Sequence, residues 1–330
     1  MPMIIGHQKV LQFLNKAYSK GSIPHGLFFF GPHAVGKHTI ATAFAESFLC
    51  DEKRFLWCAV SDGEFCESCK PENPYRKEHI ILIDDIKDPE QKSIGIDDIF
   101  VLQQKISTSS FSGKPRFVII NDAERMTSEA SNTLLKTLEE PPVNVYFILI
   151  AEAKDSLLPT IVSRTVPIRF SLTPMKELRE YLESHSKLSA DEKSSYTRFA
   201  QGRPGRMLIG LSDDGEMKEA RKKYSTAMNL LASPLYSAFQ KVDEAVKSEE
   251  SLHEYPEYLF FVLRSLLLLG SGADSSNALK IPEAMQKPLL EKFKNGKLTD
   301  IVKKLFFADY LMKQTNVSKR MAFESFLLEL

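Results

Sequence analysis

Residues 27–39 read Leu-Phe-Phe-Phe-Gly-Pro-His-Ala-Val-Gly-Lys-His-Thr and decide the fold. The apolar run Leu27–Phe30 predicts a parallel strand that is buried on both faces. Residues 39–49 carry the apolar spacing of an amphipathic helix. A tight loop must join the two, so the stretch predicts a strand, a phosphate-binding loop and a helix in succession.

The loop has the spacing G-x-x-x-x-G-K, formed by Gly31, Gly36 and Lys37. Small residues let successive backbone N–H groups point at a phosphate, and the lysine reaches the terminal phosphate oxygens. The positive end of the following helix adds to this attraction. The pattern therefore predicts a nucleotide site. Its candidate residues are Gly31, Pro32, Ala34, Val35, Gly36, Lys37, His38, Thr39 and, after a later strand, Asp122.

His38 departs from the usual pattern, because this position is normally Ser or Thr and holds magnesium. A neutral imidazole is a poor ligand for a hard, oxygen-seeking cation. ATP with Mg²⁺ is the expected ligand if the loop still binds nucleotide. The alternative is a loop that now serves only for packing.

Composition sets wide limits on function. The 330 residues include 43 basic and 43 acidic side chains, so no global positive charge attracts nucleic acid. The start of the chain lacks a signal-like segment, and the longest apolar run, Leu259–Leu269, is short and interrupted by Arg264. We expect a cytoplasmic protein of two or three domains.

All four cysteines, Cys50, Cys58, Cys66 and Cys69, fall within 20 residues. The Cys66–Cys69 spacing is that of a zinc knuckle, and two further thiolates would complete a tetrahedral structural Zn²⁺ site. In a reducing compartment a metal is favoured over disulfides. The alternative is one free buried cysteine with chance neighbours, because the intervals 50–58 and 58–66 are looser than those of paired knuckles.

Strand-like and helical segments alternate after the cysteines, which predicts a doubly wound α/β sheet. The predicted strands are 79–85, 117–120, 145–151 and 167–170, and the predicted helices between them are 96–106 and 127–140. Asn121 and Asp122 stand where a P-loop ATPase carries a magnesium-binding aspartate and a water-activating glutamate. Asn121 brings no charge and Asp122 is short, so general-base hydrolysis is not favoured.

From Thr173 onward the pattern is helical throughout. A small helical unit, broken by Gly202, Pro204 and Gly205, precedes longer amphipathic helices. The predicted helices are 175–184, 190–201, 206–211, 215–246, 252–269, 281–294 and 298–330.

The sequence resembles the AAA+ clamp loaders of bacterial DNA polymerase III, which open the ring-shaped sliding clamp. The motifs that carry this resemblance are Ile5-Gly6-His7-Gln8, the loop at residues 31–39, the cysteine insertion, Leu134–Pro142 and Ser163-Arg164. From about residue 214 only the helical pattern matches. The resemblance implies an AAA+ α/β domain over 1–171 with the cysteine module at about 50–69, a helical lid over 172–213, and a helical collar for oligomerisation over 214–330.

Within that family the gamma and tau subunits carry a complete nucleotide set, whereas delta prime commonly has a degenerate one. His38, Asn121-Asp122 and Ala151-Glu152 are departures of the delta prime kind. The expected sensor arginine falls at Gly205, with Arg206 beside it.

Ser163-Arg164 resembles the family's arginine finger, which neutralises charge at the nucleotide of an adjacent subunit. For an isolated arginine, the alternative is simple pairing with a nearby carboxylate.

The sequence thus predicts a delta prime-like stator that helps load the clamp on primed DNA and supplies Arg164 in trans, with little or no ATPase activity of its own. Its expected partners are gamma/tau ATPases and delta, with the clamp and primed DNA reached through the assembly, and no membrane. The alternative is an active gamma/tau-type ATPase in which Thr39 and Asp122 replace the missing groups. Direct DNA recognition is a weaker third hypothesis, which the neutral net charge disfavours.

Overall fold

A computed structural model describes residues 4–56, 66–70, 72–85, 93–107, 113–212, 214–240, 255–272, 281–293, 297–313 and 317–330. The chain divides into two compact units. Unit 1 comprises Met1–Leu188 and Ala200–Arg206, and unit 2 comprises Ser189–Phe199 and Met207–Leu330. No helix in the described ranges is long and apolar enough to cross a membrane.

Unit 1 is built on a five-stranded parallel sheet with the order β2-β3-β4-β1-β5. The strands are β1 (Gly26–Phe30), β2 (Ile80–Leu82), β3 (Arg116–Ile120), β4 (Val145–Ala151) and β5 (Val166–Arg169). Because β1 lies between β4 and β5, the predicted central strand buried on both faces is confirmed.

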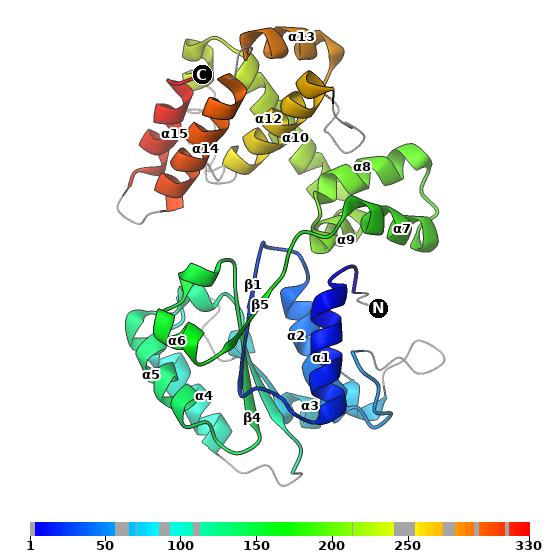
Figure 1. The fold of residues 1–330 in the computed structure, drawn as a ribbon, viewed down its shortest axis with the longest axis vertical. Helices are drawn as coiled ribbons and strands as arrows, with labels where there is room; N and C mark the ends of the chain where they lie inside the picture. The colour runs from blue at the N-terminus through cyan, green and yellow to red at the C-terminus, as the bar shows by residue number, and fades with distance from the viewer. Residues whose placement is uncertain are drawn as a thin grey trace. The chain divides into compact units, whose positions relative to one another are not determined.

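Helices cover both faces of the sheet, as Figure 1 shows. On one face Phe29 packs in a cluster with Phe44 of α2 and Leu14 of α1. On the other face Phe28 packs in a second cluster with Leu134 of α5 and residues of α4 and α6. The sheet alternates its side chains between two buried layers, which confirms the doubly wound α/β fold.

The helices of unit 1 are α1 (Gln8–Lys20), α2 (Lys37–Leu49), α3 (Pro74–His79), α4 (Ile96–Ser107), α5 (Ser128–Glu139), α6 (Pro159–Ser163) and α7 (Met175–His185), and 3₁₀ turns lie at Glu67–Cys69, Ile83–Asp85, Ala123–Arg125 and Lys154–Ser156. The strand predicted over 79–85 is wrong at both ends. Only the three residues of β2 pair with β3, because His79 is the last residue of α3 and a 3₁₀ turn follows Leu82.

Unit 2 is helical and has its own apolar core. Further helices in the described ranges include α8 (Ala190–Ala200), α9 (Pro204–Ser212), α10 (Asp214–Ala232), α12 (Tyr255–Ser271), α13 (Glu283–Lys292), α14 (Lys297–Lys313) and α15 (Lys319–Leu327). Leu259 and Leu263 of α12, Leu305 of α14 and Phe323 of α15 are buried together in that core.

Two predictions for this region are wrong. The helix expected over 215–246 is interrupted after Ala232, where Ser233 precedes Pro234, because the residue before a proline is disfavoured in the helical conformation. Residues 235–240 are helical again. The helix expected over 298–330 is two helices, and the second begins after Ser318, whose hydroxyl accepts a hydrogen bond from the Met321 backbone N–H. Residues 241–246 and 314–316 of these predictions lie outside the described residues.

Candidate functional site

The predicted phosphate loop lies at the carboxyl end of β1, directly before α2. Gly31 and Gly36 adopt positive φ angles of 149° and 100°, which glycine tolerates best. Gly31 also approaches β5 closely, because a Cβ placed on it would lie 2.1 Å from the Phe170 carbonyl oxygen. Glycine is therefore required at the two positions for different reasons: close packing at Gly31 and the backbone conformation at Gly36.

Lys37 is buried and turns back into its own loop. Its Nζ donates to the carbonyl oxygens of Gly31 at 2.5 Å and of Pro32 at 2.8 Å. Burial lowers the pKa of Lys37, and the negative charges of Glu152, Glu124 and Asp122 oppose that shift. The lysine thus has both hydrogen-bond acceptors and negative charge around it without a phosphate.

Glu124 was not identified from the sequence. It follows β3, and its Oε1 accepts a hydrogen bond of 3.3 Å from the Glu152 backbone N–H at the end of β4. Burial raises the pKa of Glu124, and nearby Asp122 and Glu152 raise it further. The only signal available in the sequence was its position one turn after a strand of the parallel sheet. The segments that follow β3 and β4 therefore place negatively charged carboxylates near Lys37. A terminal phosphate bound there would also be negatively charged and would be repelled by them.

His38 stands at the position of the usual magnesium-binding hydroxyl, and Asp122 stands at the position of the water-activating glutamate. Burial lowers the pKa of His38, whereas Asp84 and Asp122 act in the opposite direction. Asp122 has φ 46°, and its carboxylate lies 3.7 Å from the Arg125 guanidinium. A largely neutral imidazole and a carboxylate that already has a cationic partner form a poor hard-cation site. The use of Asp122 with magnesium stays a prediction.

Two further segments, which contain Gly205 and His7, contact the backbone of the loop. The Gly205 backbone N–H donates to the Ala34 carbonyl oxygen at 2.9 Å, and a Cβ on Gly205 would also lie 2.9 Å from that oxygen. From the other end of the sequence, His7 Nε2 lies 2.9 Å from the Val35 carbonyl oxygen. These contacts had no sequence signal beyond the glycines and the Ile5–Gln8 motif.

Arg206 stands beside the expected sensor position, and its use as a sensor stays a prediction. Arg206 Nη1 donates to the Gln201 side-chain oxygen at 3.4 Å. Arg203 instead is close enough for its charge to lower the pKa of Lys37.

Three of the four cysteines come together. Cys50 caps α2, Cys66 and Cys69 flank a 3₁₀ turn, and the three sulfur atoms lie within 4.8 Å of one another. Cys50 and Cys69 are buried. Cys58 lies outside the described residues. With Zn–S bonds of about 2.3 Å, sulfur atoms this close could share one tetrahedral ion, so the donor set fits Zn²⁺.

The cysteine cluster is anchored to the α/β unit by charged side chains. Glu46, whose pKa burial raises, lies 2.6 Å from Arg76 of α3. Lys114, just before β3, donates to the Leu49 carbonyl oxygen at 3.1 Å and lies 3.7 Å from Asp51. The cysteine segment is therefore attached at both the α2 and the β3 sides.

Arg164 lies at the opposite edge of the sheet from the phosphate loop. It closes α6 immediately before β5, and the β5 register pairs Val166 with Leu27 at the beginning of β1. The loop follows the other end of β1, whose five residues span roughly 16 Å. Arg164 is therefore placed away from its own chain's loop.

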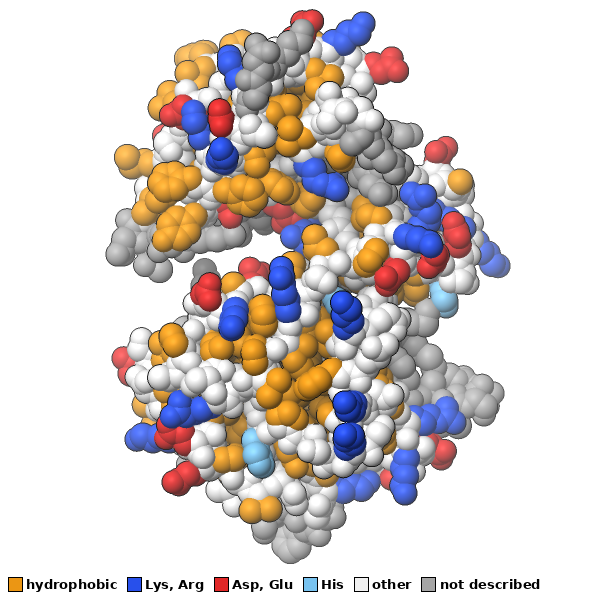
Figure 2. Space-filling view, viewed as in Figure 1, with side chains coloured by type: hydrophobic (Ala, Val, Ile, Leu, Met, Phe, Trp, Pro, Cys, Tyr) orange, Lys and Arg blue, Asp and Glu red, His pale blue; other side chains and the backbone are white. Residues whose placement is uncertain are grey.

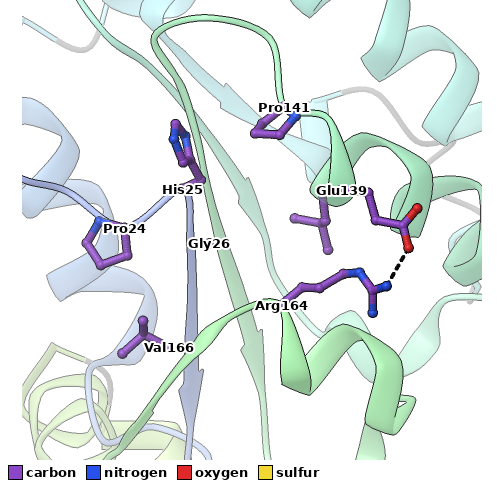
Figure 3. A pocket seen from close by; sticks show the side chains of 8 residues that line it. Pro24, His25, Gly26, Glu139, Pro141, Arg164 and Val166 are labelled. Carbon is purple, nitrogen blue, oxygen red and sulfur yellow. Dashed lines mark ion pairs between the residues drawn. The ribbon is translucent and has the colours of Figure 1, made fainter.

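Arg164 lines an open pocket of about 420 Å³ (Figure 3). Its lining consists of Pro24, His25, Gly26, Leu138, Glu139, Pro141, Arg164 and Val166. Arg164 Nη2 lies 2.5 Å from Glu139 Oε1. The carboxylate pairing considered as an alternative from the sequence is thus present in this structure.

The parallel sheet order, the loop after β1 and the arginine before β5 define a P-loop α/β protein of the AAA+ class with an appended helical unit. The chain belongs to the family described as DNA polymerase III, delta subunit, whose sequence profile matches residues 6–174.

Similar proteins include delta' and gamma/tau subunits of DNA polymerase III. The delta' subunit of Bacillus subtilis is 30% identical over 217 residues, which cover 65% of this chain and 62% of that protein. The gamma/tau subunit of Mycobacterium tuberculosis is 30% identical over 180 residues, covering 54% of this chain and 30% of that protein. The chain therefore spans less than two thirds of the length of either relative.

Among solved structures, a gamma-subunit-related protein of Thermotoga maritima is 20% identical, with 96% of this chain and 97% of that chain covered and a TM-score of 0.45. The clamp loader delta protein of Bacillus subtilis is 12% identical over 97% of this chain and 98% of that chain, with a TM-score of 0.33. Neither likeness is close enough to carry a functional argument.

Proposed function

We propose that this chain is a delta prime-like subunit of a DNA polymerase III clamp loader, acting as a stator that lends Arg164 to a neighbouring ATPase subunit. The observation that carries the proposal is the position of Arg164 at the edge of the sheet opposite its own phosphate loop. An arginine there is badly placed for nucleotide on its own chain and well placed for one presented by another subunit. Arginine fingers neutralise the charge that develops during phosphoryl transfer.

The phosphate loop supports a passive role. Lys37 is bonded to two carbonyl oxygens, and Glu124 and Glu152 add negative charge around it. A nucleotide would have to displace those hydrogen bonds and bring its own negative charge beside the carboxylates. The residues at the magnesium and base positions, His38 and Asp122, supply neither a hydroxyl ligand nor a glutamate.

Unit 2 offers a surface for assembly. Phe306, Phe307 and Tyr310 of α14 are 57%, 63% and 60% exposed. Figure 2 shows hydrophobic side chains gathered over this part of unit 2. Exposed aromatic clusters mark interaction sites, so we assign α14 to contacts with other loader subunits. The collar over 214–330, the lid over 172–213 and the AAA+ domain over 1–171 remain parts of this proposal.

ATP turnover tests the stator role directly. The chain alone should be inactive, and a loader reconstituted with its ATPase partners, clamp and primed DNA should be active. Arg164→Ala should lower turnover at the adjacent site by on the order of 10³, whereas Lys37→Ala should leave the assembled rate within about twofold of wild type. Arg179→Ala, which removes an exposed arginine of α7, is the matched control. Unchanged activity in Arg164→Ala would refute the trans role.

An active gamma/tau-type ATPase is the second candidate, because gamma/tau relatives match at the same identity as delta' and the loop lysine is retained. Turnover by the isolated chain that disappears in Lys37→Ala would establish it.

The cysteine cluster is proposed as a structural Zn²⁺ site made by Cys50, Cys66 and Cys69, with Cys58 as the fourth ligand expected from the sequence. Reduced, freshly purified protein should contain one zinc per chain by elemental analysis, and Cys69→Ser should lower that content. Metal-free wild-type protein would contradict the assignment. Ser47→Ala, which removes a hydroxyl bonded to the Leu56 backbone N–H in the same region, should retain zinc.

A further inference from the structure

The Arg164 guanidinium is engaged on two sides. Nη2 faces Glu139 at 2.5 Å, and Nη1 donates to the Thr160 carbonyl oxygen at 3.1 Å and to the Ser163 hydroxyl at 3.4 Å. Figure 3 shows the Arg164 and Glu139 side chains pointing toward one another, with a dashed line that marks their ion pair. Thr160 and Ser163 belong to α6 itself, so of these three acceptors only the Glu139 carboxylate comes from another helix, α5.

The two partners are brought together by the packing of their helices. Glu139 is the last residue of α5, and Arg164 caps α6. Both helices are held by the same buried cluster, in which Leu134 and Leu138 of α5 lie with Ile161 of α6. The ion pair is therefore set by two rigid elements rather than by a loop.

The pair is accessible from solvent. The Arg164 and Glu139 side chains are 36% and 49% exposed, and both line the pocket. Ion pairs this exposed contribute little to stability, about 0.2–1 kcal/mol. An anion of higher charge could therefore replace the carboxylate as the partner of Arg164.

We propose that Glu139 is an internal competitor for Arg164, a positioning residue that holds the guanidinium until the terminal phosphate of a neighbouring subunit's nucleotide displaces it. This inference rests on the trans role of Arg164 proposed above. A terminal phosphate offers more negative charge and more acceptor oxygens than a carboxylate, and charge-assisted bonds from arginine to phosphate are frequently bidentate. The exchange changes the partner of the cation and forms no covalent bond.

The competition predicts the sign of the effect of removing the carboxylate charge. While Glu139 holds Arg164, the finger is less available to the neighbouring site, so Glu139 should restrain hydrolysis. Glu139→Gln keeps the length of the side chain and removes its charge. From the usual strength of exposed pairs, turnover of the reconstituted loader without clamp and DNA should rise about 1.4- to 5-fold.

The test compares Glu139→Gln with Glu140→Gln, the exposed neighbouring glutamate, in the reconstituted loader. A rise in Glu139→Gln alone supports the competition, and an unchanged or lower rate overturns it. The double variant Glu139→Gln/Arg164→Ala should match Arg164→Ala, because Glu139 acts only through Arg164. If Glu139→Gln still raised the rate without Arg164, the inference would fail.

A second measurement uses the full chain without partners. The guanidinium ¹⁵N–¹H signals of Arg164, assigned by their loss in Arg164→Lys, should shift in Glu139→Gln and stay in place in Glu140→Gln. An unmoved signal overturns the ion pair in solution. The two proposals fail separately. An Arg164→Ala loader with unchanged turnover refutes the finger. An Arg164→Ala loader with lowered turnover, together with a Glu139→Gln loader whose turnover is unchanged, refutes only the competitor.

Discussion

Gly31→Ala should destabilise the chain far more than the same change at Gly36, although both glycines belong to the phosphate-loop motif. At Gly31 the added Cβ would lie 2.1 Å from the Phe170 carbonyl oxygen, against a closest normal approach of about 3.0 Å. The loop and the chain after β5 would have to separate by about 0.9 Å. At Gly36 a Cβ meets no atom within 4 Å.

The magnitude follows from what that separation disturbs. The Phe170 N–H donates to the Phe30 carbonyl oxygen at 2.7 Å, and weakening this bond costs about 0.5–1.5 kcal/mol. Forcing atoms into a packed core adds about 1–3 kcal/mol, and a φ of 149° adds about 1–3 kcal/mol for a residue with a side chain. We expect a loss of about 2.5–7.5 kcal/mol for Gly31→Ala, from these three contributions. For Gly36→Ala we expect about 1–2 kcal/mol, from its left-handed conformation alone.

Urea unfolding followed by circular dichroism measures the difference, with both variants compared at equal protein concentration and without nucleotide. Equal stability of the two variants would refute the packing explanation of Gly31. It would return that glycine to its usual explanation, room for a phosphate.

Two other expectations concern the same unit. Burial raises the pKa of Glu124, so its cost to stability is absent below the ordinary pKa of 4.5 and grows as pH rises through the folded value. Glu124→Gln should therefore be more stable than wild type at neutral pH and should lose that advantage in acid. An advantage that does not change with pH in urea titrations would contradict this. Thr127 caps α5 by accepting a 3.2 Å hydrogen bond from the Ala130 N–H, so Thr127→Ala should lower the free energy of unfolding by about 1 kcal/mol. Thr133→Ala removes a hydroxyl within the same helix and should lower it less. A larger loss in Thr133→Ala than in Thr127→Ala would argue against the cap.

The strands of unit 1 could be predicted because each is a short run of apolar residues followed by a turn. Leu27–Phe30 and Val145–Ala151 were placed within one residue of β1 and β4. The order of the strands could not be predicted, because residues of both strands are buried on either face and nothing in their composition selects a neighbour. Pattern determined the elements, and packing determined their arrangement.

The candidate site shows the same division. Motif spacing pointed to Lys37 and the cysteines, and the family resemblance pointed to Arg164, but neither predicted the groups that these residues contact. Glu139 lies 25 positions before Arg164 in the sequence and meets it only because α5 and α6 end at the same place. The single long helix expected over 298–330 was wrong because the apolar spacing is helical in both α14 and α15, whereas Ser318 caps the start of a second helix.

The hydrogen bond between Gly205 N–H and the Ala34 carbonyl oxygen is made entirely by the main chain. No side-chain replacement removes its acceptor, and only proline would remove its donor. The attachment of residue 205 to the loop is therefore insensitive to most changes in the side chains of a nucleotide site. A loop that carries His38, where Ser or Thr usually binds magnesium, can in this way keep its shape whichever side chain stands at that position.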